Sequence, residues 1–572
     1  MEKINKLRNL ISKYQIDGYL IPKNDEFFNE YVSQNYDRLR FISSFSGSFG
    51  FALILKKKNY LFVDGRYTLQ AKIQSGKFFE IITIPSKYPY DILKTKKLKI
   101  GFDPKLFTKK TLGFFFQKTE CEKVPINQNL IDKLWQRNTN TKIKKFYSLP
   151  NKAFSQSYVK KLNKLVKVLN RKKANYQFVT ASENIAWLLN IRGEDTKYTP
   201  MPNAYLLLDN KRKINLFCDL RKIEKSFKKK FNGINFIDIK KTNLFLLDIK
   251  NKKILIDDST CSVYFQNLLQ KNNQILKLVD PIYFLKAIKS KKEMQNIINS
   301  HIHDGVALTK FLFWIKDNFE KKFIDEIYAQ EKLLEFRKQN TNFKFLSFPT
   351  ISGSGPNGAI IHYKATEKSS RQLKKGDIYL VDSGGQYSFG TTDVTRTISL
   401  KSKNARIKNI FTRVLKGHIA VARFNLKTNT TGAQVDVAAR KFLKEVNLDY
   451  SHGTGHGVGY FLNVHEGPQA ITKKNKTSFK EGMIFSNEPG YYEKGKFGIR
   501  IENHIKGKKI RTNIAFEDLT MAPIDKELID KNLLKKEEIH WLNNYHKKVF
   551  KNLKKFMSKI ELLKLKEACS NI

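Results

Sequence analysis

Two hairpin-like segments that each bring a pair of acidic residues together constrain this chain more than any other feature. In residues 379–398, YLVDSGGQYSFGTTDVTRTI, two β-type runs flank the glycine-containing GGQYSFG, which is typical of a hairpin with a longer loop. A turn centred on residues 387 and 388 places Asp382 directly opposite Asp393, with Cβ atoms roughly 5 Å apart. Because two carboxylates so placed repel each other, this hairpin predicts a cation between them.

The second hairpin is predicted in residues 487–503, NEPGYYEKGKFGIRIEN. With its turn centred on Gly495, Glu488 faces Glu502 in the same way. Four carboxylates from two hairpins suit a pair of divalent metals about 3.5–4 Å apart, with Asp and Glu bridging them.

A histidine-containing segment, HGTGHGVGYFLNVHEGP, lies between the hairpins at residues 452–468. Its alternating glycines argue against a helix, so His452 and His456 are expected on one face of a strand. This arrangement supplies one nitrogen ligand and a neighbouring acid–base or hydrogen-bonding group. An oxygen-rich donor set with a single imidazole favours Mn, Co, Fe or Zn over a calcium cage or a thiolate zinc site.

The first half of the chain contains an internal similarity. Residues 39–67 and 185–221 share one plan: a short apolar segment ending in glycine, two β-type runs and a final Asp-x-Arg. A β-type segment also opens each copy, at 18–22 and 176–180. Self-similarity of this kind indicates two copies of one α/β unit, although any two α/β domains can share such a pattern.

Breaks near Pro150 and Pro281 divide the chain into three expected domains. Apolar residues at helical spacing from Met294 open a long helix after the second break, and further helices are expected at 405–424 and 431–447. The predicted domains are 1–149, 150–285 and 286–572, the last ending in a helical tail (about 510–572) whose helical pattern is clear after about 537.

Composition narrows the class of protein. The 572 residues include Lys+Arg 106 and Asp+Glu 53, a net charge of +53, and Phe 43 and Tyr 24 supply core-forming side chains that argue against disorder. The lysines are spread along the chain without a basic tail or an aromatic-interleaved basic motif, which favours a solvated surface over a nucleic-acid site. Four widely spaced cysteines, no secretory segment and no long apolar run indicate a soluble protein of a reducing compartment.

The motifs DSGGQYxxGTTDVTRT, HGTGHGVGxFLNVHEGP and EPGYYExGxFGIRIEN resemble the metal-binding signatures of aminopeptidase P, the Xaa-Pro aminopeptidases, among the pita-bread metallopeptidases. The resemblance extends to FPTISGSGPNGAIIHY, ENIAWLLNIRG, EEIHWLNNYH, FISSFSGSFG and VDGRYTLQA, and so to essentially the whole chain. It is similar to the long, three-domain cytosolic form. The implied fold is α/β (α+β), with two similar N-terminal creatinase-like α/β domains followed by a C-terminal pita-bread catalytic domain.

The resemblance implies that the metal ligands are Asp382, Asp393, His456, Glu488 and Glu502. Asp393 and Glu502 bridge two metals, Asp382 completes one metal, and His456 with Glu488 completes the other. The implied cofactor is two divalent ions per chain, Mn²⁺ first, with Co²⁺, Fe²⁺ or Zn²⁺ as alternatives.

Further site residues follow from the same resemblance. His362 and His465 match histidines that contact substrate and steady the tetrahedral intermediate, and His452 matches a further histidine lining the site. Tyr492 and Arg500 match positions near the proline-binding pocket.

The residues themselves offer a plainer role for Arg500, a salt bridge to Glu502 on the same strand face. Two further histidines belong to a tail segment expected to be a structural helix, His540 and His546. The others fit no motif and are expected at the surface or in packing: His301, His303, His418 and His504.

The implied reaction removes the N-terminal residue from peptides with proline at the second position. A hydroxide bridging the metals attacks the carbonyl before proline, while a metal and His362 or His465 stabilise the oxyanion. Glu488 carries a proton to the leaving nitrogen. The implied protein is a cytoplasmic homodimer with no specific nucleic acid and no membrane as partners.

Two other functions remain open on the sequence. A prolidase uses the same five ligands, but the length and the duplicated N-terminal unit favour the aminopeptidase, because the shorter enzymes have one such domain. A non-catalytic pita-bread protein that binds peptides, histones or nucleic acid is compatible with the charge of +53. The presence of all five ligand residues favours an enzyme, because such relatives typically lose ligands.

Overall fold

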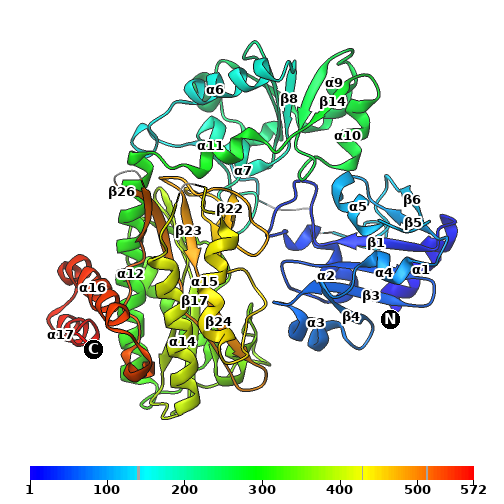
Figure 1. Ribbon diagram of the computed structural model, residues 1–572. Helices are drawn as coiled ribbons and strands as arrows, with labels where there is room; N and C mark the ends of the chain where they lie inside the picture. Colours follow the sequence, from blue (N-terminus) through cyan, green and yellow to red (C-terminus); the bar gives the residue numbers. More distant parts are fainter. Residues whose placement is uncertain (138–141, 428, 511–512) are drawn as a thin grey trace. The chain divides into compact units, whose positions relative to one another are not determined.

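The computed structural model describes residues 1–137, 142–427, 429–510 and 513–572. The chain divides into two units, Met1–Tyr283 and Phe284–Ile572, each with its own sheets and helices (Figure 1). The first unit holds both α/β sheets, and the domain boundaries at residues 149 and 285 stay predictions.

Two six-stranded sheets of the same topology form the first unit. In spatial order, the first contains β4 (Glu80–Ile84), β3 (Asn59–Asp64), β2 (Phe51–Leu55), β1 (Gly18–Pro22), β5 (Lys99–Phe102) and β6 (Glu122–Pro125). The second contains β12 (Ile234–Asp238), β11 (Ile214–Cys218), β10 (Tyr205–Asp209), β8 (Tyr176–Val179), β13 (Lys253–Ile256) and β14 (Gln274–Lys277). Strand directions also agree between the two sheets. In the first, β1 is antiparallel to β2 and parallel to β5; in the second, β8 is antiparallel to β10 and parallel to β13.

The Asp-x-Arg that follows the second predicted β-run has the same geometry in both copies. Arg66 Nη2 lies 2.7 Å from Asp64 Oδ2, and Arg221 Nη2 lies 2.7 Å from Asp219 Oδ2. In each copy the arginine backbone N–H also donates to the aspartate at 3.0 Å. The predicted duplication is confirmed by the sheets and by this shared turn.

Short helices and one small ladder complete the first unit. The ladder joins β7 (Tyr147–Ser148) and β9 (Ile191–Arg192). The helices are α1 (Glu2–Lys13), α2 (Arg38–Ser43), α3 (Thr68–Ser75), α4 (Pro89–Leu93), α5 (Lys109–Phe115), α6 (Tyr158–Arg171), α7 (Ser182–Leu189), α8 (Lys225–Lys230), α9 (Thr242–Leu247) and α10 (Val263–Gln270), and α11 (Pro281–Ala287) includes the boundary between the units.

Antiparallel sheets form the second unit. Two have three strands, namely β15 (Phe343–Leu346), β18 (Gly385–Tyr387) and β19 (Gly390–Thr391), and β16 (Ile351–Ser354), β17 (Ile378–Ser383) and β20 (Val394–Ser399). A five-stranded sheet contains β22 (Glu466–Ile471), β21 (Gly455–Gly457), β23 (Ile484–Asn487), β26 (Asn503–Ile510) and β27 (Asn513–Asp518), and a two-stranded ladder contains β24 (Gly490–Glu493) and β25 (Phe497–Arg500).

Long helices cover these sheets. The expected helices are present as α12 (Lys291–Asn318), α14 (Ala405–Ala422) and α15 (Gly432–Lys444), with α13 (Glu326–Lys338) between them in the chain. A capping box of Ser290 and Glu293 begins α12. Helix α14 packs on α15 and on β23 to β25, and its apolar residues at helical spacing, Phe411, Val414 and Leu415, join Ile499 in one buried cluster. This core holds the strands that carry the acidic residues.

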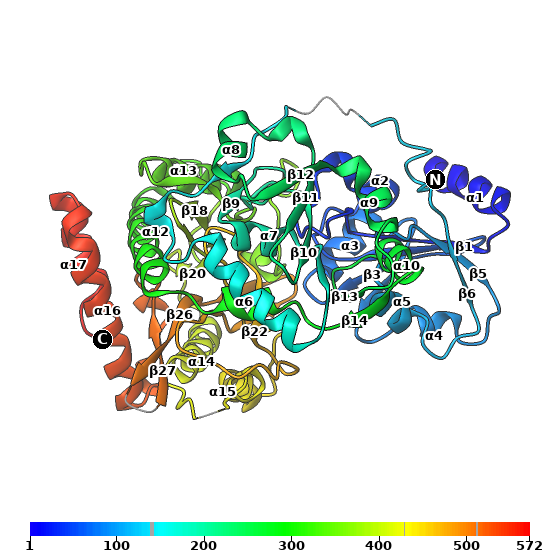
Figure 2. The same ribbon diagram turned by 90° about the horizontal axis from the view of Figure 1, so that it is seen from above.

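Helices α16 (Lys536–Leu553) and α17 (Lys559–Ala568) lie along the outside of the second unit (Figure 2). The expectation of a helical tail from about 510 was wrong at its start, because β27 occupies residues 513–518. Alternating Ile514 and Phe516 pack against a buried apolar cluster, and that period of two favours a strand. Within the described ranges, every helix is too short or too polar to serve as a membrane-spanning segment.

Candidate metal centre and active site

The first acidic hairpin has a register that differs from the prediction. Asp382 of β17 pairs with Thr395 of β20, so Asp393 lies diagonal to Asp382 and the predicted direct pairing was wrong. The turn falls one residue later than predicted, because Phe389 adopts a left-handed conformation with φ of 75°. The two carboxyl groups still interact, since burial first and then the charges of Asp382 and Glu488 raise the pKa of Asp393 well above its usual value.

The second acidic hairpin has the predicted register. Gly490 pairs with Arg500 in the ladder of β24 and β25, and Asn487 pairs with Asn503 in the ladder of β23 and β26. Glu488 and Glu502 occupy the gap between these two ladders and lie in register with each other. The predicted opposition of these two glutamates is therefore confirmed.

His456 supplies an imidazole to the acidic residues. It lies in β21, and its Nδ1 donates to the backbone carbonyl of Gly457 at 2.8 Å, which leaves Nε2 without a hydrogen in the neutral ring. Nε2 lies 3.6 Å from Asp393 Oδ2 and 3.6 Å from Glu488 Oε1. A ring fixed through its other nitrogen by a carbonyl is the usual state of a metal-binding histidine.

Several carboxylate oxygens of the cluster are buried without a hydrogen-bond donor. Within the described residues, these are Asp382 Oδ1, Asp393 Oδ1 and Glu502 Oε1. Burial first and then the charges of Asp393 and Glu488 raise the pKa of Glu502 well above its usual value. Each unsatisfied buried acceptor costs about 1–3 kcal/mol. Carboxylates with an aligned imidazole are a donor set that binds divalent cations, so these residues fit a dinuclear metal centre.

Candidate ligand atoms converge at three points, where three atoms at a time lie within 4.8 Å of one another. Across the described chain, the sets are Asp393 with His456 and His465, Asp393 with Glu502 and His504, and His456 with Glu488 and Glu502. Four of the five predicted ligands occur in them. The fifth, Asp382, is held instead by Arg500, whose Nη2 lies 2.6 Å from Asp382 Oδ2.

Arg500 belongs to a buried chain of hydrogen bonds. Besides Asp382, it donates through Nη1 to Tyr492 Oη at 2.6 Å, and Tyr492 Oη lies 2.9 Å from His452 Nε2. The expected salt bridge from Arg500 to Glu502 was wrong, because Glu502 Oε2 accepts from Thr395 Oγ1 at 2.7 Å. Burial first raises the pKa of Tyr492 to about 12 and lowers the pKa of His452 to about 4.

The position of His452 differs from the expectation. It lies in a bend before β21 rather than on the strand with His456. Its Nδ1 donates to the carbonyl of Gly453 at 2.7 Å, and the ring faces Tyr492. His452 Nδ1 is 3.9 Å from Glu488 Oε2, so the ring still borders the acidic cluster.

His465 reaches the centre, and its ring lies edge-on to His456 with centroids 4.4 Å apart. Its neighbour Glu466 forms a buried triad, in which the ammonium groups of Lys286 and Lys289 lie 3.2 Å and 2.6 Å from its carboxylate. Because Glu466 also pairs with Gly457 next to His456, the triad fixes the loop that brings the two imidazoles together.

His362 lies in a turn after the 3₁₀ helix η5 (Gly355–Ala359), which packs against β24 and β25. A Cβ at Gly498 would lie 1.7 Å from the carbonyl oxygen of Gly358, so only glycine allows this approach. The loop that carries His362 therefore begins next to β25, the strand that ends at Arg500.

Sequence reasoning missed several polar groups of the site. Ser486 Oγ accepts from the His456 backbone N–H at 2.9 Å and donates to Glu488 Oε1 at 3.0 Å. Thr395 and His504 were also missed. The signal for His504 was its spacing, since residues two apart on a strand share a face and Glu502 was already a predicted ligand.

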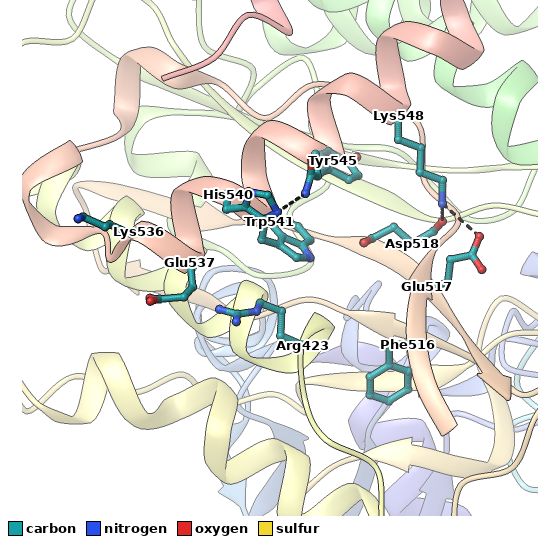
Figure 3. A pocket seen from close by; sticks show the side chains of 11 residues that line it. Arg423, Phe516, Glu517, Asp518, Lys536, Glu537, His540, Trp541, Tyr545 and Lys548 are labelled. Atoms are coloured by element: carbon teal, nitrogen blue, oxygen red, sulfur yellow. Dashed lines mark hydrogen bonds and ion pairs between the residues drawn. The ribbon is translucent and has the colours of Figure 1, made fainter. Parts of the chain in front are cut away.

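A separate pocket of about 640 Å³ lies between β27 and α16 (Figure 3). Some of its polar groups bind one another, since Lys548 donates to the carbonyl of Asp518 at 2.6 Å and His540 contacts Asn544 at 2.8 Å. None of the residues predicted for the site is among those that line this pocket.

Comparisons with known proteins identify the family of this chain. Residues 295–506 match the model of metallopeptidase family M24, residues 3–133 and 137–293 each match a creatinase/prolidase N-terminal domain, and residues 513–572 match the C-terminal region of peptidase M24. The chain is 37% identical over 574 residues to a probable Xaa-Pro aminopeptidase P of Laccaria bicolor, covering 95% of this chain and 89% of that protein. The chain belongs to the Xaa-Pro aminopeptidase P family of metallopeptidases.

Solved structures extend the comparison. The X-prolyl aminopeptidase of Caenorhabditis elegans, described as a cytosolic enzyme with a dinuclear active site, matches with a TM-score of 0.95 and 30% identity, covering 100% of this chain and 99% of that one. The prolidase of Pyrococcus horikoshii matches with a TM-score of 0.52 and 25% identity, covering 64% of this chain and 99% of that one. The expected fold of two creatinase-like domains and a pita-bread catalytic domain is confirmed, and this Xaa-Pro aminopeptidase family member is a metalloaminopeptidase.

Proposed function

We propose that this enzyme removes the N-terminal residue from peptides whose second residue is proline, using two divalent metal ions. The observation that carries the proposal is the cluster of four carboxylates, three of them buried, in which the aligned Nε2 of His456 lies 3.6 Å from Asp393 and from Glu488. The proposed ligands are those expected from the sequence: Asp382, Asp393, His456, Glu488 and Glu502.

Burial supports the proposed roles of the ligands. Asp393 and Glu502 are the most buried acids of the cluster, at 5% and 1% exposure, and are proposed to bridge the two ions. Asp382 would complete the ligands of one ion, and His456 with Glu488 would complete those of the other. When bound, the two ions supply Lewis acidity and lower the pKa of a coordinated water.

Glu488 is proposed to move the proton. Burial opposes its ionisation, but the attraction of His456, His452 and Arg500 outweighs burial and keeps the pKa of Glu488 below its usual value. The ionised carboxylate accepts a proton from the attacking water and donates it to the leaving proline nitrogen. Ser486 holds the same carboxylate through its hydroxyl, which fixes the oxygen that faces His456.

Histidines 362 and 465 are proposed to contact the substrate. The edge-on ring of His465 beside His456 supports a position next to the scissile carbonyl, where an N–H stabilises the oxyanion. Tyr492 and Arg500 are proposed to border the proline pocket and His452 to line the site beside them, because their hydrogen bonds fix one wall of the site. A shaped wall is required, since the nitrogen of an Xaa-Pro bond has no hydrogen for recognition.

The enzyme is proposed to act on oligopeptides rather than only on dipeptides. The match to the X-prolyl aminopeptidase over the full length of both chains supports this reading, whereas the prolidase covers 64% of this chain. We propose Mn²⁺ as the working ion, a cytoplasmic location and a homodimer. The lysine-rich surface is proposed to have no specific nucleic-acid partner.

The test is hydrolysis of three peptides by EDTA-stripped enzyme, with and without added Mn²⁺. We expect Mn²⁺-dependent release of arginine from Arg-Pro-Pro and no cleavage of the control Arg-Ala-Ala. Cleavage of the dipeptide Ala-Pro alone identifies a prolidase instead. If metal binds and none of the three peptides is cleaved, the proposed function is wrong.

A further inference from the structure

A buried histidine pair lies behind the acidic cluster. His301 of α12 and His504 of β26 are 3% and 0% exposed, and His301 Nε2 lies 2.8 Å from His504 Nδ1. Both were expected either at the surface or in packing. Both are buried, so the second alternative describes them. A direct contact between two imidazoles is informative, because one proton at most can lie between the two nitrogens.

The backbone decides which nitrogen of each ring carries the proton. His301 Nδ1 lies 2.8 Å from the carbonyl oxygen of Ile297, and a carbonyl only accepts, so Nδ1 is the donor. In the neutral ring, His301 Nε2 then has no hydrogen and accepts from His504 Nδ1. His504 Nε2 is consequently left with a lone pair and no hydrogen.

The ring of His504 borders two of the acidic residues. His504 Nε2 is buried and has no hydrogen-bond partner in the described part of the chain. Ligand atoms of His504, Asp393 and Glu502 lie within 4.8 Å of one another. An imidazole lone pair beside two carboxylates, with no donor between them, is unfavourable unless a cation takes all three.

The geometry points to His504 as a further metal ligand, with His301 as the residue that positions it. This inference rests on the proposed function, because it adds a ligand to the same metal centre. His504 Nε2 would hold one of the two ions together with Asp393 and Glu502. His301 holds the ring through the other nitrogen, as a backbone carbonyl does for His456.

The added imidazole changes the expected chemistry of the centre. With His456 alone, the donor set is nearly all oxygen, whereas a second imidazole favours borderline ions such as Co²⁺ and Zn²⁺ relative to Mn²⁺. The inference therefore predicts that Co²⁺ and Zn²⁺ bind more tightly relative to Mn²⁺ than they would at a five-ligand centre.

The test compares metal binding by wild type, His504→Val, His301→Phe and the control His303→Gln. His303 lies two residues from His301 on the same helix, but its ring packs against Phe556 and not against the cluster. Each EDTA-stripped protein is titrated with Co²⁺, with calorimetry and the visible d–d absorption as readouts. X-ray absorption of the Co²⁺-loaded proteins counts imidazole nitrogens.

We expect His504→Val to lower the affinity for one of the two Co²⁺ ions by about 10- to 100-fold. The d–d spectrum of that ion should change, and the imidazole count should fall by one nitrogen. His301→Phe should lower the affinity for the same ion by a smaller factor and keep the imidazole count. His303→Gln should match wild type. If His504→Val keeps the affinity, spectrum and imidazole count of wild type, the inference is overturned.

A second measurement covers the case in which His504→Val does not fold. The imidazole count of the wild type itself, compared with that of His465→Ala, separates His465 from His504. A count explained by His456 alone, or by His456 and His465 alone, overturns the inference. A wild type that binds two ions with His504 but cleaves no peptide overturns the proposed function and leaves this inference standing.

Discussion

At the residue scale, Arg500 connects groups that the sequence pattern keeps separate. It ion-pairs with Asp382 and donates to Tyr492, whose hydroxyl in turn donates to His452. Motif spacing predicts that these residues lie close together, and their hydrogen bonds show that they do. It does not predict which carboxylate Arg500 takes, because Thr395 already satisfies one oxygen of Glu502.

Tyr492→Phe removes the hydroxyl at the centre of this chain. His452 Nε2 and Arg500 Nη1 both lose a buried partner, so we expect the free energy of unfolding to fall by about 1–3 kcal/mol. We also expect kcat/KM for a proline-containing tripeptide to fall about tenfold, with metal content unchanged. Urea denaturation, steady-state kinetics and metal analysis check these outcomes.

The matched control is Tyr491→Phe, because Tyr491 is the neighbouring residue on β24 and lies outside this chain of hydrogen bonds. It should behave as wild type. Equal effects of the two changes would show that the hydrogen bonds of Tyr492 have no special role.

At the element scale, the pairing of β21 with β22 depends on the buried triad around Glu466. Each of its three side chains is 1% exposed, and the two ammonium groups share one carboxylate. Nothing in the local pattern around His465 predicts this triad, since Lys286 and Lys289 are far away in sequence and sit among many surface lysines.

Glu466→Gln keeps the shape of the side chain and removes its charge. Because two buried ammonium groups then lose this carboxylate, we expect the free energy of unfolding of the second unit to fall by about 3–5 kcal/mol. Lys289→Met is the control and should cost less, since the pair of Lys286 and Glu466 remains. Equal costs in urea denaturation would contradict the role given to Glu466.

Helix α16 adds a pH dependence to stability. His546 is fully buried and its Nε2 accepts from the Ile524 backbone N–H at 3.1 Å, and burial first lowers the pKa of His546 from 6.5 to about 3. Its contribution is complete above about pH 6.5 and is lost as the pH falls toward 3, because only the unfolded state binds the proton. At pH 5 the loss is about 2 kcal/mol.

His546→Gln keeps an acceptor for Ile524 and cannot titrate in this range. We expect its stability to fall less between pH 7 and 5 than that of wild type, by about 2 kcal/mol. His540→Gln changes an exposed histidine on the same helix and should keep the wild-type slope. Thermal melts at both pH values would refute the assignment if the two variants gave the same slope.

At the scale of the whole molecule, the sequence predicts architecture better than register. The duplicated sheets, the three long helices and the convergence of two acidic hairpins follow from patterns within each segment. The diagonal placement of Asp393, the strand β27 and the pairing of His301 with His504 depend on which distant segment packs against each element. The periodicity of a local segment does not predict these long-range contacts.

The net charge of +53 also belongs to the whole molecule. We expect duplex DNA to bind in about 50 mM salt and to dissociate by about 300 mM salt, because dispersed lysines release counterions without reading bases. Two unrelated duplex sequences should bind equally in a fluorescence-anisotropy titration. A sequence preference that persists at the higher salt would contradict the solvated-surface interpretation.

The most direct test of the account is a Mn²⁺ titration of EDTA-stripped wild type and Asp393→Asn, followed by assay with Arg-Pro-Pro. Wild type should bind two ions per chain. Asp393→Asn should lose both, with kcat/KM reduced at least about a thousandfold. Its metal-free form should melt no lower than wild type, because the change removes carboxylate repulsion. If folded Asp393→Asn kept two ions and wild-type turnover, the proposed metal centre would be wrong.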